Sequence, residues 1–116
     1  MESIMPDDSF KEFVLDRLSS ISELRAKAMF GGYGLYQGDL FFGILYEGQL
    51  YFKTETSTAS DYLARGMKPF TYEIKGRTVT MGYHEVPPDI LENAVELSEW
   101  AAGAISVAAK SPRKKK

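Results

Sequence analysis

The sequence predicts a two-layer α+β domain in which an antiparallel sheet of about five strands is covered by helices. Three observations predict this class. Short apolar and aromatic runs alternate with glycine-containing turns, as in hairpins. Helical spacing of apolar residues occurs near both ends of the chain. No internal repeat or linker precedes residue 111. The expected order is helix, three strands, helix, two strands, helix (α-β3-α-β2-α).

The composition fits one folded domain with a charged end. A chain of 116 residues buries roughly two thirds of the surface that its unfolded form exposes. Hydrophobic residues make up 44% and charged residues 26%, as in globular proteins. We expect a single domain over residues 1–110. Residues 111–116 contain no apolar side chain and are expected to form a disordered basic tail.

The first element is expected to be a helix over residues 7–22. Its apolar residues recur three or four positions apart, which places them on one side of a helix. They are Phe10, Phe13, Val14, Leu18 and Ile21. The charged residues between them then face water. This apolar stripe predicts that the helix packs against the sheet.

The centre of the chain, residues 29–53, is expected to form a meander of three antiparallel strands. Three short apolar and aromatic runs are separated there by glycine-containing turns. Both alternating sets of side chains in residues 40–46 are bulky or apolar, which favours a central strand. Glu47-Gly48 predicts a two-residue hairpin, because the glycine supplies the positive φ that this turn requires.

The second half of the chain predicts a short helix, a hairpin and a long helix. Residues 59–64 lack strand alternation and precede Gly66, a typical residue after a helix end. Residues 70–74 and 77–83 alternate in polarity on either side of Lys75-Gly76, which predicts a second hairpin. A long helix over residues 89–110 is expected to pack on the sheet, with Gly103 as the point of any break.

The charge distribution argues against a DNA-binding surface on the folded domain. Residues 1–109 hold nine basic and 16 acidic side chains, whereas binding to a duplex requires a basic surface. Only the tail offers a cluster of cations, and we expect weak contact with nucleic acid there at most. Its basic residues are Arg113, Lys114, Lys115 and Lys116. A chain end of this kind is more often a solubilising tail.

The sequence offers no recognisable catalytic set, metal site or cofactor site. The absence of cysteine excludes disulfides and thiolate chemistry. His84 is the only histidine, and neighbouring Glu85 is expected on the opposite face of a strand. No apolar run is long enough to span a membrane. We therefore expect a cytoplasmic protein that is not an enzyme and needs no cofactor.

The run Gly31-Gly32-Tyr33-Gly34 allows two interpretations. Its backbone amides could form an anion-binding nest, with Arg25 and Lys27 adding charge. The run leads into a strand rather than into the helix that phosphate loops precede, which favours glycines required by a turn or bulge. Tyrosines on the strands are expected to pack in the core, and any that remain exposed together would mark a protein contact.

Many dispersed positions also agree, in order, with one known family. They include Arg25, the segment from Met29 to Tyr36, the segment from Leu50 to Lys53, Gly66, Pro69-Phe70, Tyr83, Val86-Pro87, Leu97 and Trp100-Ala101. On these residues the chain resembles the TfoX N-terminal domain family between about Arg25 and Ala108. Full-length members of this family carry a second, helical domain after the one that is similar to this chain.

The resemblance implies a secretion-chaperone-like fold and a regulatory role. TfoX-type proteins are bacterial regulators of gene expression in competence and are not known as enzymes. We therefore expect a protein-interaction domain with a protein partner, and a homodimer as a second expectation, since such folds are often dimers. The candidate interaction loop consists of Arg25, Gly31, Gly32, Tyr33, Gly34 and Tyr36. A protein that binds a small ligand or an anion is the alternative.

Overall fold

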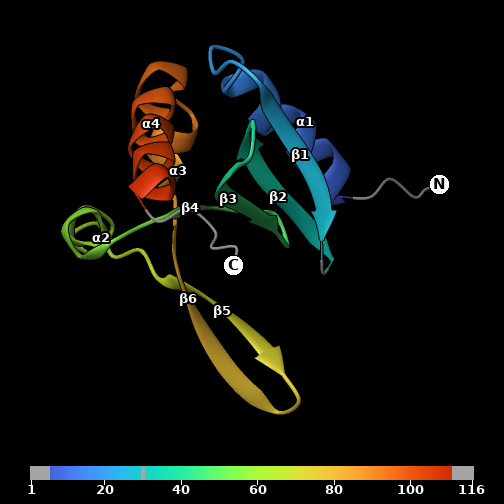
Figure 1. Ribbon diagram of the computed structural model, residues 1–116, viewed down its shortest axis with the longest axis vertical. Helices are drawn as coiled ribbons and strands as arrows, with labels where there is room; N and C mark the ends of the chain where they lie inside the picture. Colours follow the sequence, from blue (N-terminus) through green and yellow to red (C-terminus); the bar gives the residue numbers. More distant parts are fainter. Residues whose placement is uncertain (1–5, 30, 111–116) are drawn as a thin grey trace.

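The computed structural model describes residues 6–29 and 31–110 as an antiparallel sheet with helices packed against it (Figure 1). The six strands lie in the order β1-β2-β3-β4-β6-β5. The elements are α1 (Pro6–Arg17), β1 (Leu24–Met29), β2 (Gly32–Gln37), β3 (Leu40–Tyr46), β4 (Gln49–Lys53), α2 (Thr56–Leu63), β5 (Pro69–Ile74), β6 (Arg77–Glu85), α3 (Pro88–Leu91) and α4 (Ala94–Lys110). The α+β class and the antiparallel sheet are confirmed, but the sheet has more strands than the five expected.

The additional strand is β1, which lies at one edge of the sheet and pairs only with β2 in the described structure. Its sequence, LRAKAM, contains two alanines and two cations rather than the β-branched and aromatic residues that predict strands. Charged side chains are typical of edge strands, because they discourage pairing with other chains. The predicted meander over residues 29–53 is confirmed as β2, β3 and β4, whereas the edge strand before it was missed for this reason.

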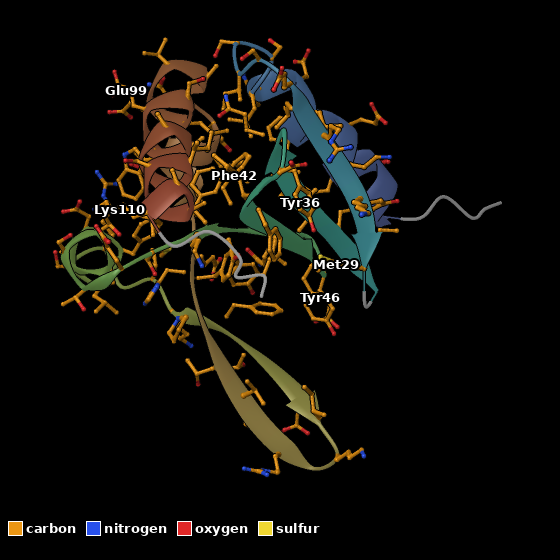
Figure 2. The ribbon with its side chains drawn as sticks, in the orientation of Figure 1. Met29, Tyr36, Phe42, Tyr46, Glu99 and Lys110 are labelled. Carbon is orange, nitrogen blue, oxygen red and sulfur yellow. The ribbon has the colours of Figure 1, made fainter. Side chains whose placement is uncertain are left out.

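The main core lies between the sheet and the helices. All four helices contribute to it, through Val14 of α1, Tyr62 of α2, Ile90 of α3 and Leu97 of α4. Phe42 of β3 is one of the sheet residues in the same core, and its side chain lies between the sheet and α4 (Figure 2). The helices therefore cover one face of the sheet and leave the opposite face to the strands.

The sheet curls, so the face away from the helices is concave. In a flat sheet with strands about 4.8 Å apart, β3 and β5 would be separated by about 14 Å, because β4 and β6 lie between them. However, the ring centroids of Tyr46 on β3 and Phe70 on β5 are only 5.5 Å apart. Beyond this contact, β5 and β6 project from the body as a two-stranded arm (Figure 1).

The first helix is shorter than predicted and ends at Arg17 instead of residue 22. The amide of Leu18 still donates to the carbonyl of Val14, but the amide of Ser19 donates to Asp16, which tightens the last turn. Serines then interrupt the helix, since they favour turns over helix interiors. Ile21 still packs against the core from outside the helix, which explains the misleading periodicity.

The predicted hairpins at Glu47-Gly48 and Lys75-Gly76 are confirmed. Glu47 and Gly48 have φ values of 50° and 76°, and Lys75 and Gly76 have values of 52° and 78°. Two consecutive positive φ values define the two-residue turn whose twist matches that of the flanking strands. These turns set the register of β3 against β4 and of β5 against β6.

The long C-terminal helix is interrupted at residues 92–93, not near Gly103 as predicted. The side-chain oxygen of Asn93 accepts a hydrogen bond of 3.1 Å from the amide of Glu96, which caps the start of α4. Gly103 lies inside α4 and is exposed. A well-placed cap thus breaks the helix, whereas a solvent-facing glycine is tolerated. Every helix in the described ranges is too short or too polar to cross a membrane. The tail expected over residues 111–116 lies outside the described residues.

Candidate interaction surface

The concave side of the sheet carries a continuous set of rings that we call the aromatic face. It consists of Tyr36, Phe41, Ile44, Tyr46, Tyr51, Phe70 and Tyr83. Ile44, Phe70 and Tyr83 form its buried base, while the other four are only partly buried. All of these residues belong to strands. In Figure 2, Tyr46 lies on the side of the sheet opposite Phe42, toward the arm.

The rings of this face contact one another across five strands. Tyr36 and Phe41 stack with centroids 5.0 Å apart, and Phe41 lies 5.5 Å from Tyr83 on β6. Phe70 meets Tyr51 edge-on at 4.9 Å. Such contacts stabilise the fold beyond the burial of area alone. The face is therefore a preformed surface whose rings are held in place by their neighbours.

Two tyrosines of this face, Tyr51 and Tyr83, have a raised pKa and therefore stay protonated near neutral pH. Burial, together with the nearby carboxylates Glu85 and Glu47, raises the pKa of the Tyr51 hydroxyl. Burial also raises the pKa of Tyr83 far above its usual value. These two hydroxyls thus remain neutral donors and acceptors. The face combines apolar rings with neutral polar groups, which is the character of protein-binding surfaces.

Three cations border the aromatic face. The guanidinium carbon of Arg25 lies 6.0 Å and the ammonium of Lys27 lies 5.9 Å from the centroid of Tyr36. The ammonium of Lys53 lies 5.1 Å from the centroid of Tyr83. At these distances a cation is attracted to a ring face. Arg25 also donates to the carbonyl of Gly38 at 3.0 Å, which fixes its position on the edge strand.

The face continues on β1 and β2 because Gly34 has no side chain. A β-carbon at Gly34 would lie 2.6 Å from the sulfur of Met29 and 2.9 Å from the ring of Phe41. Neither contact is tolerable without movement of the neighbours. Because Gly34 has no side chain, the side chains of Met29, Phe41 and Tyr36 occupy the space next to it. The glycine shapes the surface through its lack of volume.

The arm extends the apolar surface away from the body. Alternation along β5 places Ile74 on the same side as Phe70. Alternation along β6 likewise places Val79 on the same side as Tyr83. Ile74 is 47% and Val79 is 39% exposed, whereas Phe70 is 1% exposed. Exposed apolar residues next to a partly buried aromatic face are typical of an interaction site.

Comparison with known proteins identifies the family. The sequence model of the TfoX N-terminal domain matches residues 16–108. The chain belongs to this family. It is also 25% identical to Protein Sxy of Escherichia coli (strain K12) over 93 residues, which is 80% of this chain and 44% of Sxy. The chain thus spans less than half the length of that relative.

In this TfoX N-terminal domain, the predicted interaction loop is mostly not a loop. Arg25 lies on β1 and Tyr36 on β2, and they pair directly across the two strands on the aromatic face. Tyr33 lies on the opposite face, where it packs against the main core with the ammonium of Lys11 4.8 Å from its ring centroid. The two tyrosines therefore do not share a surface.

The three glycines of the predicted loop have different roles. Gly31 has a φ of 87° and belongs to the turn between β1 and β2. A β-carbon at Gly32 would lie 2.0 Å from the carbonyl oxygen of Leu45, so this position requires glycine for the close approach of β3. Gly34 makes room for the aromatic face. The participation of this segment in binding stays a prediction.

The backbone geometry does not favour an anion-binding nest in this domain. Tyr33 and Gly34 pair with β1 on one side and with β3 on the other. Amides of a strand between two paired strands point into the ladder. The described cavities also lie elsewhere: one of about 170 Å³ lies between α2 and α4, and one of about 440 Å³ lies between α1 and α4.

His84 and Glu85 point to opposite sides of β6, as their adjacency predicts. His84 pairs with Phe52 and its Nδ1 lies 2.8 Å from the hydroxyl oxygen of Thr54, on the helix-covered face. Burial lowers the pKa of His84. Glu85 pairs with Tyr51 beside the aromatic face. Within the described residues, no three histidine or carboxylate side chains are grouped closely enough to hold a metal ion.

The aromatic face as a unit was not predictable from the sequence. The tyrosines were correctly expected on strands, but their convergence depends on the order of the strands and on the curl of the sheet. One sequence feature could have indicated this second apolar face. The strands contain aromatic residues beyond those that fill the main core, namely Tyr36, Phe41 and Tyr83.

Proposed function

We propose that this TfoX N-terminal domain is a non-enzymatic, cytoplasmic regulatory domain that binds a protein partner through its aromatic face. The observation that carries the proposal is that four aromatic residues remain partly exposed on the one sheet face to which the helices do not contribute. A protein partner would bury these rings, which is the usual source of affinity at protein interfaces.

The residue types of the face support a protein partner. Tyrosine and phenylalanine are enriched in the cores of protein interfaces, where rigid rings lose little conformational entropy on binding. Tyr46 and Tyr51 are held against Phe70, so the surface needs little rearrangement. A preorganised surface of this type increases affinity because fewer groups must be ordered on binding.

The family supports a role in the regulation of competence. TfoX-type proteins are regulators of gene expression, and the chain matches the N-terminal domain of that family. Because the chain covers 44% of Sxy, we propose for it a binding step within such regulation. That this binding step serves the regulation of competence is part of the same proposal.

Retention of a partner by variants of the face tests this function. The domain is immobilised and exposed to lysate of its source cell, in the wild-type form and as Tyr36→Ala with Tyr46→Ala. The expected result is loss of the retained protein. Phe13→Ala is the matched control, since Phe13 is an aromatic residue on α1 that is 37% exposed. Unchanged retention by a folded double variant would refute a role for the aromatic face.

A further inference from the structure

We infer that the segment bound by the aromatic face is an extended, acidic peptide segment that lies along the edge of β1. This inference rests on the proposed function and specifies the chemistry of the partner. Three features of the molecule support this chemistry: the charges that border the face, the state of its rings and the position of β1 in the sheet.

Among the residues that the structure describes, the cations of the face have no carboxylate partner. Arg25, Lys27 and Lys53 lie beside the rings of Tyr36 and Tyr83. Ion pairs in the described structure occur elsewhere, for example between Arg65 and Asp89 at 2.9 Å. None of the three cations takes part in an ion pair among the residues described. Their charge is therefore available to a partner.

The sign of this charge is unusual for the chain. Residues 6–29 and 31–110 contain 15 acidic and ten basic side chains. At the β1 end of the aromatic face the balance is reversed, because Arg25 and Lys27 lie beside Tyr36, whereas the carboxylates near this face, Glu85 on β6 and Glu47 in the β3–β4 turn, lie on other parts of the sheet. Complementary charge selects partners and speeds their association. An acidic segment fits this face better than it fits the rest of the surface.

The state of the rings favours a peptide over single-stranded nucleic acid. Bases bind aromatic side chains by stacking on open ring faces. Tyr36 already stacks on Phe41 at 5.0 Å and has Arg25 and Lys27 nearby. Tyr83 is buried, with Phe41 and Lys53 next to it. The rings of Tyr36 and Tyr83 therefore already have neighbours against them, so this part of the surface offers ring edges and cations rather than open stacking platforms.

The position of β1 gives the segment its conformation. β1 is the terminal strand of the sheet, and in the described structure it pairs only with β2. An extended peptide can add to such an edge through backbone hydrogen bonds. Arg25 and Lys27 are two positions apart and point to the same side, like alternate residues of an added strand. Carboxylates at alternate positions of the segment would meet both cations.

A display experiment tests the inference without knowledge of the natural partner. Random peptides displayed on phage are selected on the immobilised domain, and the strongest binder is synthesised for titration. We expect selected peptides to carry aspartate or glutamate at alternate positions together with apolar residues. Arg25→Glu with Lys27→Glu should weaken binding by about tenfold or more, and lysines in place of the peptide's carboxylates should restore it.

Lys11→Glu is the matched control, since the ammonium of Lys11 also borders a tyrosine ring, that of Tyr33, but on the opposite face of the sheet. This variant should bind the peptide like the wild type. Selection of neutral or basic peptides, of no peptides, or of peptides insensitive to the double reversal would overturn the inference. Binding of a single-stranded oligonucleotide at the same face would also overturn it. If Tyr36→Ala with Tyr46→Ala still abolishes partner retention in those cases, the proposed function stands and only the acidic segment is refuted.

Discussion

Gly32 and Leu45 approach so closely that a β-carbon on Gly32 would lie 2.0 Å from the carbonyl oxygen of Leu45. Because that neighbour is backbone, the clash cannot be relieved by a side-chain rotation. Gly32→Ala should therefore separate β2 from β3 and destabilise the domain by about 1–3 kcal/mol or more. The free energy of unfolding in urea measures the change.

Gly103 provides the control for that substitution. It lies inside α4, is exposed, and a β-carbon there would have no neighbour within 4 Å. Gly103→Ala should stabilise the domain by about 0.5–1 kcal/mol, because alanine loses less entropy in a helix. Equal effects of the two substitutions would contradict the close approach at Gly32.

Phe70 joins the arm to the concave face. It is 1% exposed and contacts Tyr46 and Tyr51. Phe70→Ala should cost about 3–5 kcal/mol and increase amide hydrogen exchange in residues 69–85, because an isolated two-stranded hairpin is marginally stable. Ile74→Ala, at the exposed end of the arm, should change stability by less than about 0.5 kcal/mol. Exchange that is unaltered in the Phe70 variant would show that the arm does not depend on this contact.

The turn between β3 and β4 carries a strained residue. Glu47 has a φ of 50°, a conformation that asparagine adopts more readily than glutamate. Glu47→Asn should stabilise the domain by about 0.5–1 kcal/mol, as measured by thermal and urea unfolding. Gly48→Ala, at a φ of 76°, should have the opposite effect. Destabilisation by asparagine would show that the glutamate makes a compensating contact.

His84 should make stability depend on pH near neutrality. Burial lowers its pKa in the folded state, so the unfolded chain binds the proton more tightly. Stability should be complete above the unfolded pKa of about 6.5 and fall as the pH drops from there toward the lowered folded pKa. His84→Gln removes the titrating group, and its unfolding free energy should vary less over this range. An identical pH dependence in both proteins would exclude His84 as the cause.

Much of the fold was predictable because local signals agreed with the tertiary structure. The Glu47-Gly48 and Lys75-Gly76 turns were correctly predicted, since a two-residue hairpin requires positive φ and glycine supplies it. Residues 40–46 were correctly predicted as a central strand, because both of their faces are covered. The sequence signal for each of these features lies in residues that are close to one another along the chain.

The remaining features depend on contacts between distant residues. β1 was missed because an edge strand with Arg25 and Lys27 lacks the usual strand composition. The helix break at residues 92–93 reflects the cap by Asn93, which outweighs the weaker effect of Gly103. The aromatic face requires β3 to meet β5 through the curl of the sheet, and no local pattern contains that information.

Site-specific photo-cross-linking identifies the surface of the domain that a partner contacts. A photoreactive amino acid replaces Tyr46 on the aromatic face or Phe13 on α1, and each protein is irradiated in lysate of its source cell. We expect a cross-linked partner protein from position 46 and none from position 13. The same partner from both positions, or a partner from position 13 alone, would contradict the claim that the concave aromatic face is the binding surface.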